Sequence, residues 1–378
     1  MKKRIILSVI WVLLWLYFVT LFYKTICVML LFLTWQGWLR AQLPARVKPW
    51  GIKAAWAVLA LTLWWGTPDY LNLLRTPRVR LLYLNDEALR KRPPLSHYVL
   101  NTLVPEEEVV NFGLTNLTIL QPILRYVGIG GRMVRQAQDD RKAGKIGNFL
   151  YPYNHLGGGN PMSGAYAQCF NATFGEHNRV AYFQEVRNRK CTNAYPLVVF
   201  CHGYLGNWKL YQGIWSGLDN AYVLSISTPG LDGIFSPGDL QSIFDFYISA
   251  LEQTGYHVDR QQVHLIGLSN GGTAIISAMN SPYAKRFKSI TTISANLAGL
   301  RRVPCQVNLI GGGKDASASL LPSQYRKLKA MGVDAALLFD ENENHFFAVN
   351  KREEMLDFLQ KRMDLKPVPT GLPAEEIE

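Results

Sequence analysis

The chain has 378 residues, 48% of them hydrophobic, and a formal net charge of +12, a size that allows one large domain or two smaller ones. Most of the net positive charge lies in residues 1–92, which hold 14 Lys and Arg against 3 Asp and Glu, whereas the remainder is nearly neutral. A nucleic-acid-binding protein needs a basic stripe on its folded domain, so this distribution argues against that class. Basic residues beside apolar segments favour anionic lipid headgroups instead, so we expect a lipid bilayer as a partner and no nucleic acid.

The first apolar run extends from Ile5 to Trp35 behind Lys2-Lys3-Arg4 and contains one charged residue, Lys24. It is far longer than the apolar region of a secretory signal peptide, and no small-residue cleavage site follows it. About 20 apolar residues cross a bilayer, so the run predicts a transmembrane helix.

A second run, Trp50–Gly66, has tryptophans at both ends, where headgroups would lie. It is short for a span, so an interfacial helix stays open as an alternative. Two spans would put both termini on one side, and the basic residues of that side outnumber those of the intervening loop by six to four. The first set is Lys2, Lys3, Arg4, Arg75, Arg78 and Arg80, and the second is Arg40, Arg46, Lys48 and Lys53. The positive-inside rule then favours the cytoplasmic face of a cell inner membrane for the rest of the chain.

Residues 67–162 carry no recognisable chemistry and are expected to connect the membrane anchor, residues 1–66, to a second domain. Glu106-Glu107-Glu108 predicts a solvated helix start. The Gly-, Asn- and Pro-rich stretch 144–164 is typical of a loop.

From residue 163 to 362 the pattern changes to short apolar runs that alternate with helical stretches. Residues 165–173 and 179–186 predict a leading hairpin. Six further strands are predicted at 197–200, 222–227, 263–268, 289–294, 306–310 and 335–339, with helices at 207–218, 238–254, 271–280, 318–331 and 346–362. This alternation predicts an α/β fold with a mostly parallel sheet and helices on both faces. Such sheets place their sites at the carboxyl ends of the strands. Residues 363–378 are expected to form a polar tail.

The strongest motif is Gly267-Leu268-Ser269-Asn270-Gly271, which ends one predicted strand and opens a helix. A Gly-x-Ser-x-Gly at a strand-turn-helix is a nucleophile elbow, whose strained turn needs small residues beside the serine. Ser269 is therefore the predicted nucleophile, and the backbone N–H of Asn270 is a predicted oxyanion donor.

His202-Gly203-Tyr204 follows the strand that ends at Phe200. With the elbow, it makes residues 163–362 resemble the α/β-hydrolase superfamily of serine hydrolases; residues 1–162 resemble no known family. The resemblance implies that the backbone N–H of Tyr204 is the second oxyanion donor and that His202 is structural. Many members insert a lid after the sixth strand, where this chain has only Asn296–Pro304. The site is then expected to be open, or to be covered by residues 67–162 as a lid.

The remaining catalytic residues follow from the order nucleophile, acid, histidine that such enzymes keep. Only His345 of the seven histidines lies after Ser269, so it is the predicted base. The resemblance places the acid after the strand at 306–310, which points to Asp315. Asp334, Asp340, Glu341 and Glu343 stay open as rivals.

A serine nucleophile predicts acyl transfer, and we expect a membrane-anchored hydrolase of ester-type small-molecule or lipid-linked substrates. A serine peptidase or an acyltransferase would use the same residues. An inert hydrolase-fold binding protein is the alternative of another class. No cofactor is expected. None of the cysteine pairs has metal-ligand spacing. Cys27, Cys201 and Cys305 are expected to be buried thiols, and Cys169 with Cys191 stays open as a disulfide for an oxidising compartment.

Overall fold

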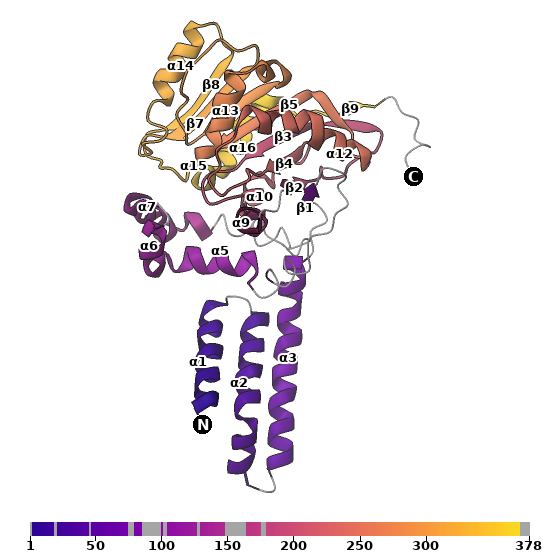
Figure 1. Cartoon of the computed structure of the whole chain (residues 1–378), viewed down its shortest axis with the longest axis vertical. Helices are drawn as coiled ribbons and strands as arrows, with labels where there is room; N and C mark the ends of the chain where they lie inside the picture. Colours follow the sequence, from indigo (N-terminus) through magenta and orange to yellow (C-terminus); the bar gives the residue numbers. More distant parts are fainter. Residues whose placement is uncertain are drawn as a thin grey trace.

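The computed structural model describes residues 2–18, 21–44, 47–74, 79–84, 100, 104–126, 129–147, 164–174 and 179–370. It has three parts (Figure 1). Helices α1, α2 and α3 stand side by side, helices α5, α6 and α7 lie across their upper end, and a sheet domain lies above them.

The N-terminal helices are α1 (Lys2–Tyr17), α2 (Leu21–Gln42) and α3 (Lys48–Leu74). The prediction of a single helix from residue 5 to 35 is wrong, because the chain folds back after α1 and helices α1 and α2 pack together. Trp35 Nε1–H donates to Ser8 Oγ across the pair at 2.6 Å, and Phe18 stacks on Tyr23 at the bend with ring centroids 4.6 Å apart. Of the helices in the described ranges, α2 alone is long and apolar enough to cross a membrane. The second apolar run lies within the longer α3.

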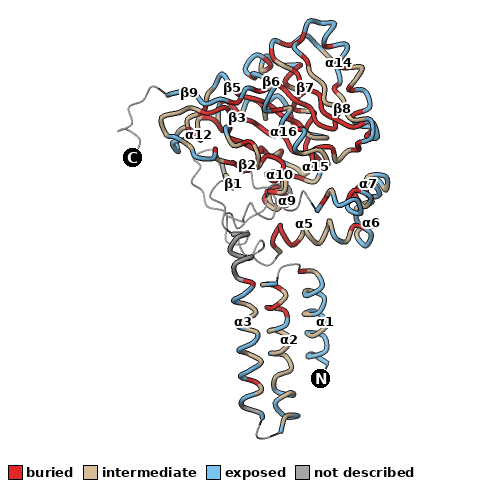
Figure 2. The backbone as a smooth tube through the Cα atoms, turned by 180° about the vertical axis from the view of Figure 1, so that it is seen from behind, coloured by how far each residue is buried: buried red, intermediate tan, exposed pale blue. Residues whose placement is uncertain are grey.

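The N-terminus and the sheet domain lie at opposite ends of these helices (Figures 1 and 2). Lys2, Lys3 and Arg4 therefore lie at the end of these helices away from the sheet domain, whereas two spans would place them on its side. The cause of this difference is the extra reversal between α1 and α2, which sequence periodicity did not show. The cytoplasmic preference drawn from two spans loses its basis.

The connecting helices are α5 (Glu106–Thr115), α6 (Leu117–Tyr126) and α7 (Gly131–Lys142). Glu106, Glu107 and Glu108 do begin a helix, but all three are buried rather than solvated. The reason is that the start of α5 docks on the sheet domain: Lys209 forms an ion pair with Glu107, and the Leu210 N–H donates to Glu106 Oε1 at 3.1 Å. Buried carboxylates are tolerated when they are paired in this way.

Within the part of the chain that the structure describes, the sheet has nine strands, of which eight follow the order β1-β2-β4-β3-β5-β6-β7-β8, while β9 pairs with β3. The strands are β1 (Val79–Leu84), β2 (Arg179–Gln184), β3 (Asn193–Cys201), β4 (Tyr222–Ile226), β5 (Val258–Leu268), β6 (Ser289–Ile293), β7 (Gln306–Gly312), β8 (Ala335–Asp340) and β9 (Val368–Pro369). From β4 to β8 every pairing along this order is parallel, whereas β1 and β2 are antiparallel. The expected mostly parallel sheet is confirmed.

The prediction of a leading hairpin is wrong. Residues 165–173 belong to helix α9 (Gly164–Phe174), and β2 pairs with β1 and β4. The buried residues of α9 include Gly164, Ala165, Ala167 and Gln168, a spacing that fits one face of a helix rather than the alternation of a strand. The sheet thus takes its edge strand from the region expected to be only a connection.

Helices cover both faces of the sheet, as expected. Alternate residues of β3 point to opposite sides, with Leu197 and Val199 in one core cluster and Val198 and Phe200 in the other. The first cluster includes residues of α11 (Pro237–Ser242), the π-helical turn η1 (Ile243–Tyr247), α12 (Ile248–Gln253), α13 (Gly272–Met279), the short helix η3 (Pro282–Arg286) and α14 (Leu321–Ala330). The second includes residues of α10 (Leu210–Trp215), α15 (Phe347–Asn350) and α16 (Arg352–Met363). Figure 2 shows the central strands buried between these layers.

Candidate active site

The turn at Ser269 connects β5, through the short helix η2 (Ser269–Gly271), to α13. Ser269 has a φ of 54°, in the left-handed region that non-glycine residues seldom adopt. The two flanking glycines are sterically required: a Cβ on Gly267 would collide with the Gly271 carbonyl, and a Cβ on Gly271 would collide with the Cys201 carbonyl. The turn has the tight, strained form that the motif predicts.

Three side chains meet at this turn in a row of hydrogen bonds. His345 Nε2 lies 3.0 Å from Ser269 Oγ, and His345 Nδ1 lies 2.9 Å from Asp315 Oδ2. The side chains of His345 and Asp315 are only 12% and 5% exposed. An ionised carboxylate only accepts hydrogen bonds, so Nδ1 carries the ring proton and Nε2 is left to accept the serine hydroxyl proton. This geometry allows proton transfer from the serine to the histidine.

The acid and the base reach the serine from adjacent loops after β7 and β8. The Lys314 N–H donates to the Glu343 carbonyl at 2.9 Å, which ties the two loops together. A Cβ on Gly312 would collide with that carbonyl, so the glycine run after β7 permits the close approach. The second oxygen of Asp315, Oδ1, accepts the Ser317 N–H at 2.9 Å, which fixes the carboxylate.

The rival acids are engaged elsewhere. Asp340 pairs with Lys351 at 3.2 Å, and the Asn342 backbone N–H together with Lys351 lowers the Asp340 pKa. Asp334 bonds to Arg362 at the amino end of β8. Glu343 binds Lys145 and Asn350. Glu341 is exposed. Of the five candidate acids, Asp315 is the one whose carboxylate contacts His345.

The other described histidines have side-chain hydrogen bonds away from the serine or lie at the far end of the sheet. His202 is fully buried, and burial lowers its pKa to about 4. Its Nδ1–H donates to the Gly203 carbonyl at 2.7 Å. His264 is also buried, beside Ser289, and burial lowers its pKa to about 3. His257 lies at the other end of the sheet, just before β5. His97, His155 and His177 fall outside the described residues.

The loop after β3 lies directly against the elbow. A Cβ on Gly203 would stand 3.2 Å from Ser269 Cβ. Because the Gly203 carbonyl faces the His202 ring, the N–H of the same trans peptide, which belongs to Tyr204, points the opposite way. Asn270 donates through its side chain to the Asp232 carbonyl at 2.9 Å. Asn270 directly follows Ser269 in the chain, and Tyr204 directly follows Gly203, which lies against Ser269.

Sequence reasoning missed a buried residue that organises this loop, Gln168 of α9. Gln168 Oε1 accepts the Asn207 N–H at 2.6 Å, and Nε2 donates to the Thr228 and Gly230 carbonyls at 3.0 and 2.7 Å. Ser294 was missed as well; its hydroxyl donates to the His345 carbonyl at 3.0 Å. Neither residue lies in a motif. The partners of Gln168 lie 39 to 62 residues away in the chain, and the partner of Ser294 lies 51 residues away.

The loops at this end of the sheet carry exposed apolar side chains. Tyr204, Ile234 and Leu320 are the large exposed apolar residues on the surrounding loops. The nine residues expected in place of a lid, Asn296–Pro304, do form only a short connection between β6 and β7. A shallow hollow of about 640 Å³ lies elsewhere, at the amino ends of the strands beside Lys288, Arg302 and Asp334, and contains none of the residues above.

The described residues form neither a metal-binding cluster nor a disulfide. In the ranges that the structure describes, no group of three or more His, Cys, Asp or Glu side chains is placed to hold a metal ion. All five cysteines are free; Cys27, Cys201 and Cys305 are buried as expected, and Cys169 and Cys191 form no disulfide.

No known protein family and no curated protein matches the chain by sequence. Among solved structures, the uncomplexed acylaminoacyl peptidase of Pyrococcus horikoshii matches 53% of this chain and 42% of its own, with 15% identity and a TM-score of 0.39. An esterase of Pyrobaculum calidifontis matches 49% of this chain and 80% of its own, with 14% identity and a TM-score of 0.39. A putative dienelactone hydrolase from Klebsiella pneumoniae matches 50% and 92%, with 16% identity and a TM-score of 0.40. These similarities are too low to transfer an activity, and the match spans less than half of the peptidase.

Proposed function

We propose that the chain is a serine hydrolase that cleaves carboxylic esters through an acyl-enzyme on Ser269. The observation that carries this proposal is the continuous row of hydrogen bonds from Ser269 through His345 to Asp315. A serine hydroxyl is a weak nucleophile until a neighbouring base takes its proton, and His345 Nε2 is within reach to do so. Asp315 holds the ring in the required tautomer and stabilises the imidazolium that forms.

The reaction then has two steps, acylation and deacylation of Ser269. Ser269 Oγ attacks the ester carbon as its proton moves to His345 Nε2, and the same proton passes to the departing alcohol when the ester bond breaks. Water attacks the acyl-enzyme in the second step, giving one proton to His345. That proton returns to Ser269 Oγ as the carboxylic acid leaves, so the enzyme is regenerated.

The oxyanion of each tetrahedral intermediate would be held by the backbone N–H groups of Tyr204 and Asn270. This assignment is supported by the approach of Gly203 to Ser269 and by the Tyr204 N–H, which points away from the buried His202. Loss of one such donor typically costs about 10²–10³ in rate. The hydrogen bonds of Gln168 would keep the Tyr204 loop in place.

Ester hydrolysis is preferred because the loops around Ser269 carry the exposed apolar side chains of Tyr204, Ile234 and Leu320, which suit an acyl chain. A peptidase or an acyltransferase would use the same row of residues with an amine as the leaving group or another alcohol as the acceptor. An inert binding protein would have no need of the aligned proton path.

We further propose that α1, α2 and α3 hold the enzyme in a bilayer and that its substrates are lipid-linked or otherwise amphipathic esters. The apolar side chains of α1 are largely exposed, and α2 has the length and composition of a membrane span. Helix α6 also exposes an apolar stripe beside these helices, with Ile119, Ile123 and Tyr126 at 70%, 60% and 92% exposure. Such a stripe is typical of a helix that lies in a membrane interface.

A substrate panel tests the reaction class. The detergent-solubilised protein is expected to hydrolyse short soluble esters, and Ser269→Ala should lower turnover by about 10⁴ or more. Ser277→Ala is a matched control on the adjacent helix, because its hydroxyl donates to the Phe235 carbonyl instead. Faster cleavage of peptide bonds than of esters would assign a peptidase. A wild-type protein without turnover on any acyl substrate would favour the binding protein.

A further inference from the structure

A buried polar cluster connects α7 to the loop that carries His345. The cluster comprises Asp140, Lys145, Glu343, Asn344 and Asn350. Asp140 Oδ2 accepts hydrogen bonds from Asn344 Nδ2 at 2.9 Å and from Asn350 Nδ2 at 3.0 Å. Lys145 Nζ lies 2.9 Å from Glu343 Oε1 and 3.7 Å from Asp140 Oδ1. Both carboxylates are almost fully buried.

The partners of Asp140 stand immediately beside the proposed base. Asn344 precedes His345, and its Oδ1 accepts the Phe346 N–H at 2.8 Å, which closes a turn around the histidine. The Asn344 side chain thus accepts a hydrogen bond within the loop through Oδ1 and donates one to Asp140 of α7 through Nδ2. Phe346 packs against the apolar cluster that contains Ala137 and Ile146, on the same side.

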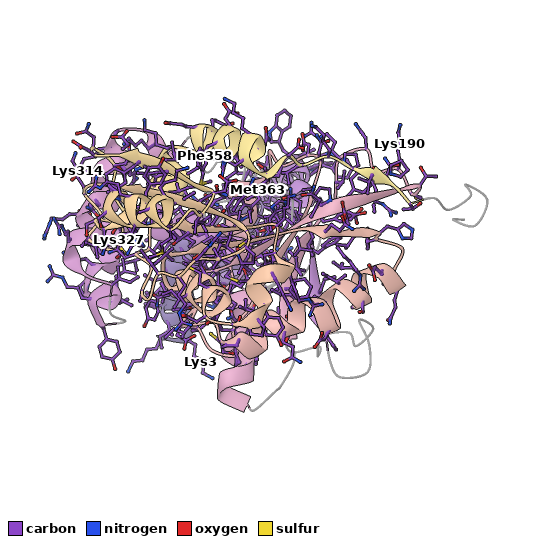
Figure 3. The ribbon with its side chains drawn as sticks, turned by 90° about the horizontal axis from the view of Figure 1, so that it is seen from above. Lys3, Lys190, Lys314, Lys327, Phe358 and Met363 are labelled. Atoms are coloured by element: carbon purple, nitrogen blue, oxygen red, sulfur yellow. The ribbon has the colours of Figure 1, made fainter. Side chains whose placement is uncertain are left out.

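The segment that carries Asp140 also reaches the loop of the proposed acid. Gln136 Nε2 donates to the Lys314 carbonyl at 3.3 Å, one residue before Asp315. In Figure 3, Lys314 lies at the edge of the domain that overlies the connecting helices, far from Lys190. Residues 131–147 therefore contact the loops of both the acid and the base, and none of these contacts is to Ser269 itself.

We propose that Asp140 is a positioning residue that holds His345 in register through Asn344. The inference rests on the proposed function, since it needs His345 to be the base. Catalytic side chains must be held within about 0.5 Å of their productive geometry by the groups behind them. On the domain side the Ser294 hydroxyl fixes the His345 carbonyl, and on the other side Asp140 fixes the adjacent Asn344. The connecting region would thus be part of the catalytic apparatus rather than a spacer.

The charge of Asp140 suits this role. A buried carboxylate is costly unless it is hydrogen-bonded and paired, and here two amide donors and one ammonium group surround it. An acceptor placed at residue 344 would oppose it directly. Asn344→Asp does this while keeping the oxygen that accepts the Phe346 N–H, so it breaks only the bond between the segments.

The test measures kcat per labelled serine, by titrating active sites with a fluorophosphonate and then measuring ester turnover. Asn344→Asp is expected to lower kcat per site by about 10–100-fold, because a displacement of about 1 Å can cost 10²-fold in rate. KM should change less. The exchange Asp140→Asn with Asn344→Asp restores a donor opposite the acceptor at residue 344 and should recover part of the loss, because Asn350 still loses the oxygen to which it donates. Asp139→Asn, on the exposed neighbouring carboxylate, is the matched control and should behave as wild type.

A merely structural role would lower the fraction of labelled protein but leave kcat per site unchanged, and that result would overturn the proposal. An exchange no better than Asn344→Asp alone would overturn it as well. Should Asn344→Asp fail to fold, Asn344→Ser is the milder variant: its hydroxyl can still accept the Phe346 N–H but is too short to reach Asp140. Wild-type kcat per site in Asn344→Ser would contradict the proposal. Absence of labelling in the wild-type protein would overturn the proposed function, and the positioning role with it.

Discussion

Asp315 and Asp340 follow adjacent strands, and both lie near His345 in the sequence or in space. Only Asp315 bonds to the histidine, whereas Asp340 is partly exposed and pairs with Lys351. Asp315→Asn is therefore expected to lower kcat by about 10³–10⁴ with the fold intact, because the amide would favour the wrong histidine tautomer. Asp340→Asn should lower it less than about threefold. The reverse order of the two variants in an ester turnover assay would transfer the acid role to Asp340.

Two buried histidines make the fold sensitive to acid. Burial lowers the pKa of His202 to about 4 and that of His264 to about 3, from 6.5. The unfolded chain binds these protons more readily, so this stability is complete above pH 6.5 and is lost as the pH falls toward 4. At pH 5 each histidine should cost roughly 2 kcal/mol. When the pH is lowered from 7 to 5, the free energy of unfolding should therefore fall by about 2 kcal/mol less in His264→Gln than in wild type. Denaturant unfolding at both pH values measures this, and equal losses would contradict it.

Single residues were predictable where a motif fixes them. Ser269 and His345 follow from a strand-turn-helix glycine pattern and from the chain order of the histidines. Asp140 gives no such signal, because its partner Asn344 is 204 residues away and both residue types are common on surfaces. Sequence separation also hid the burial of Glu106 and Glu107, whose hydrogen-bonding and ionic partners in the sheet domain lie 76 to 104 residues away.

At the level of elements, the six predicted strands and the helices between them are present, since continuous apolar runs separated by turn residues mark strands buried on both faces. The hairpin failed because small and polar residues in 165–173 fit either period. Strand β1 went unnoticed because its partner β2 begins 95 residues later, and pairing over that distance leaves no local pattern.

Strand β1 and the start of α5 give a prediction about truncation. A chain that begins at residue 160 would lose β1, the buried glutamates of α5 and the contacts of Asp140, and would expose the β2 edge. It is expected to aggregate or to lack cooperative unfolding. A chain that begins at residue 76 keeps all of these and should retain soluble-ester activity. Calorimetry and turnover compare the two; a stable, fully active chain from residue 160 would show that the connecting region is dispensable.

At the level of the whole molecule, helix α6, which carries the apolar stripe, lies near the upper end of the N-terminal helices (Figure 1). Ile123→Glu is expected to lower hydrolysis of esters in anionic vesicles about tenfold while leaving soluble short esters unaffected, because the stripe would no longer enter the interface. Met331→Glu, at an exposed apolar site after α14, is the control. Equal activity of both variants on vesicles would mean that α6 does not meet the bilayer.

The arrangement of helices was less predictable than the sheet. Hydropathy locates apolar segments, but the reversal after α1 depends on tertiary contacts such as those of Phe18 with Tyr23. The additional reversal between α1 and α2 changes which basic groups lie at the same end of the helices. Composition correctly indicated an N-terminal apolar region, and it could not determine the number of helices within it.

The central claim is that His345 activates Ser269 for acyl transfer. The most direct measurement is mass spectrometry of the intact protein and its peptides after reaction with a fluorophosphonate. Wild type is expected to gain one adduct, on the peptide that contains Ser269. Ser269→Ala should gain none, and His345→Ala should react slower by several orders of magnitude, while His202→Ala retains more reactivity. An adduct on another residue, or wild-type labelling of Ser269→Ala or His345→Ala, would contradict the claim.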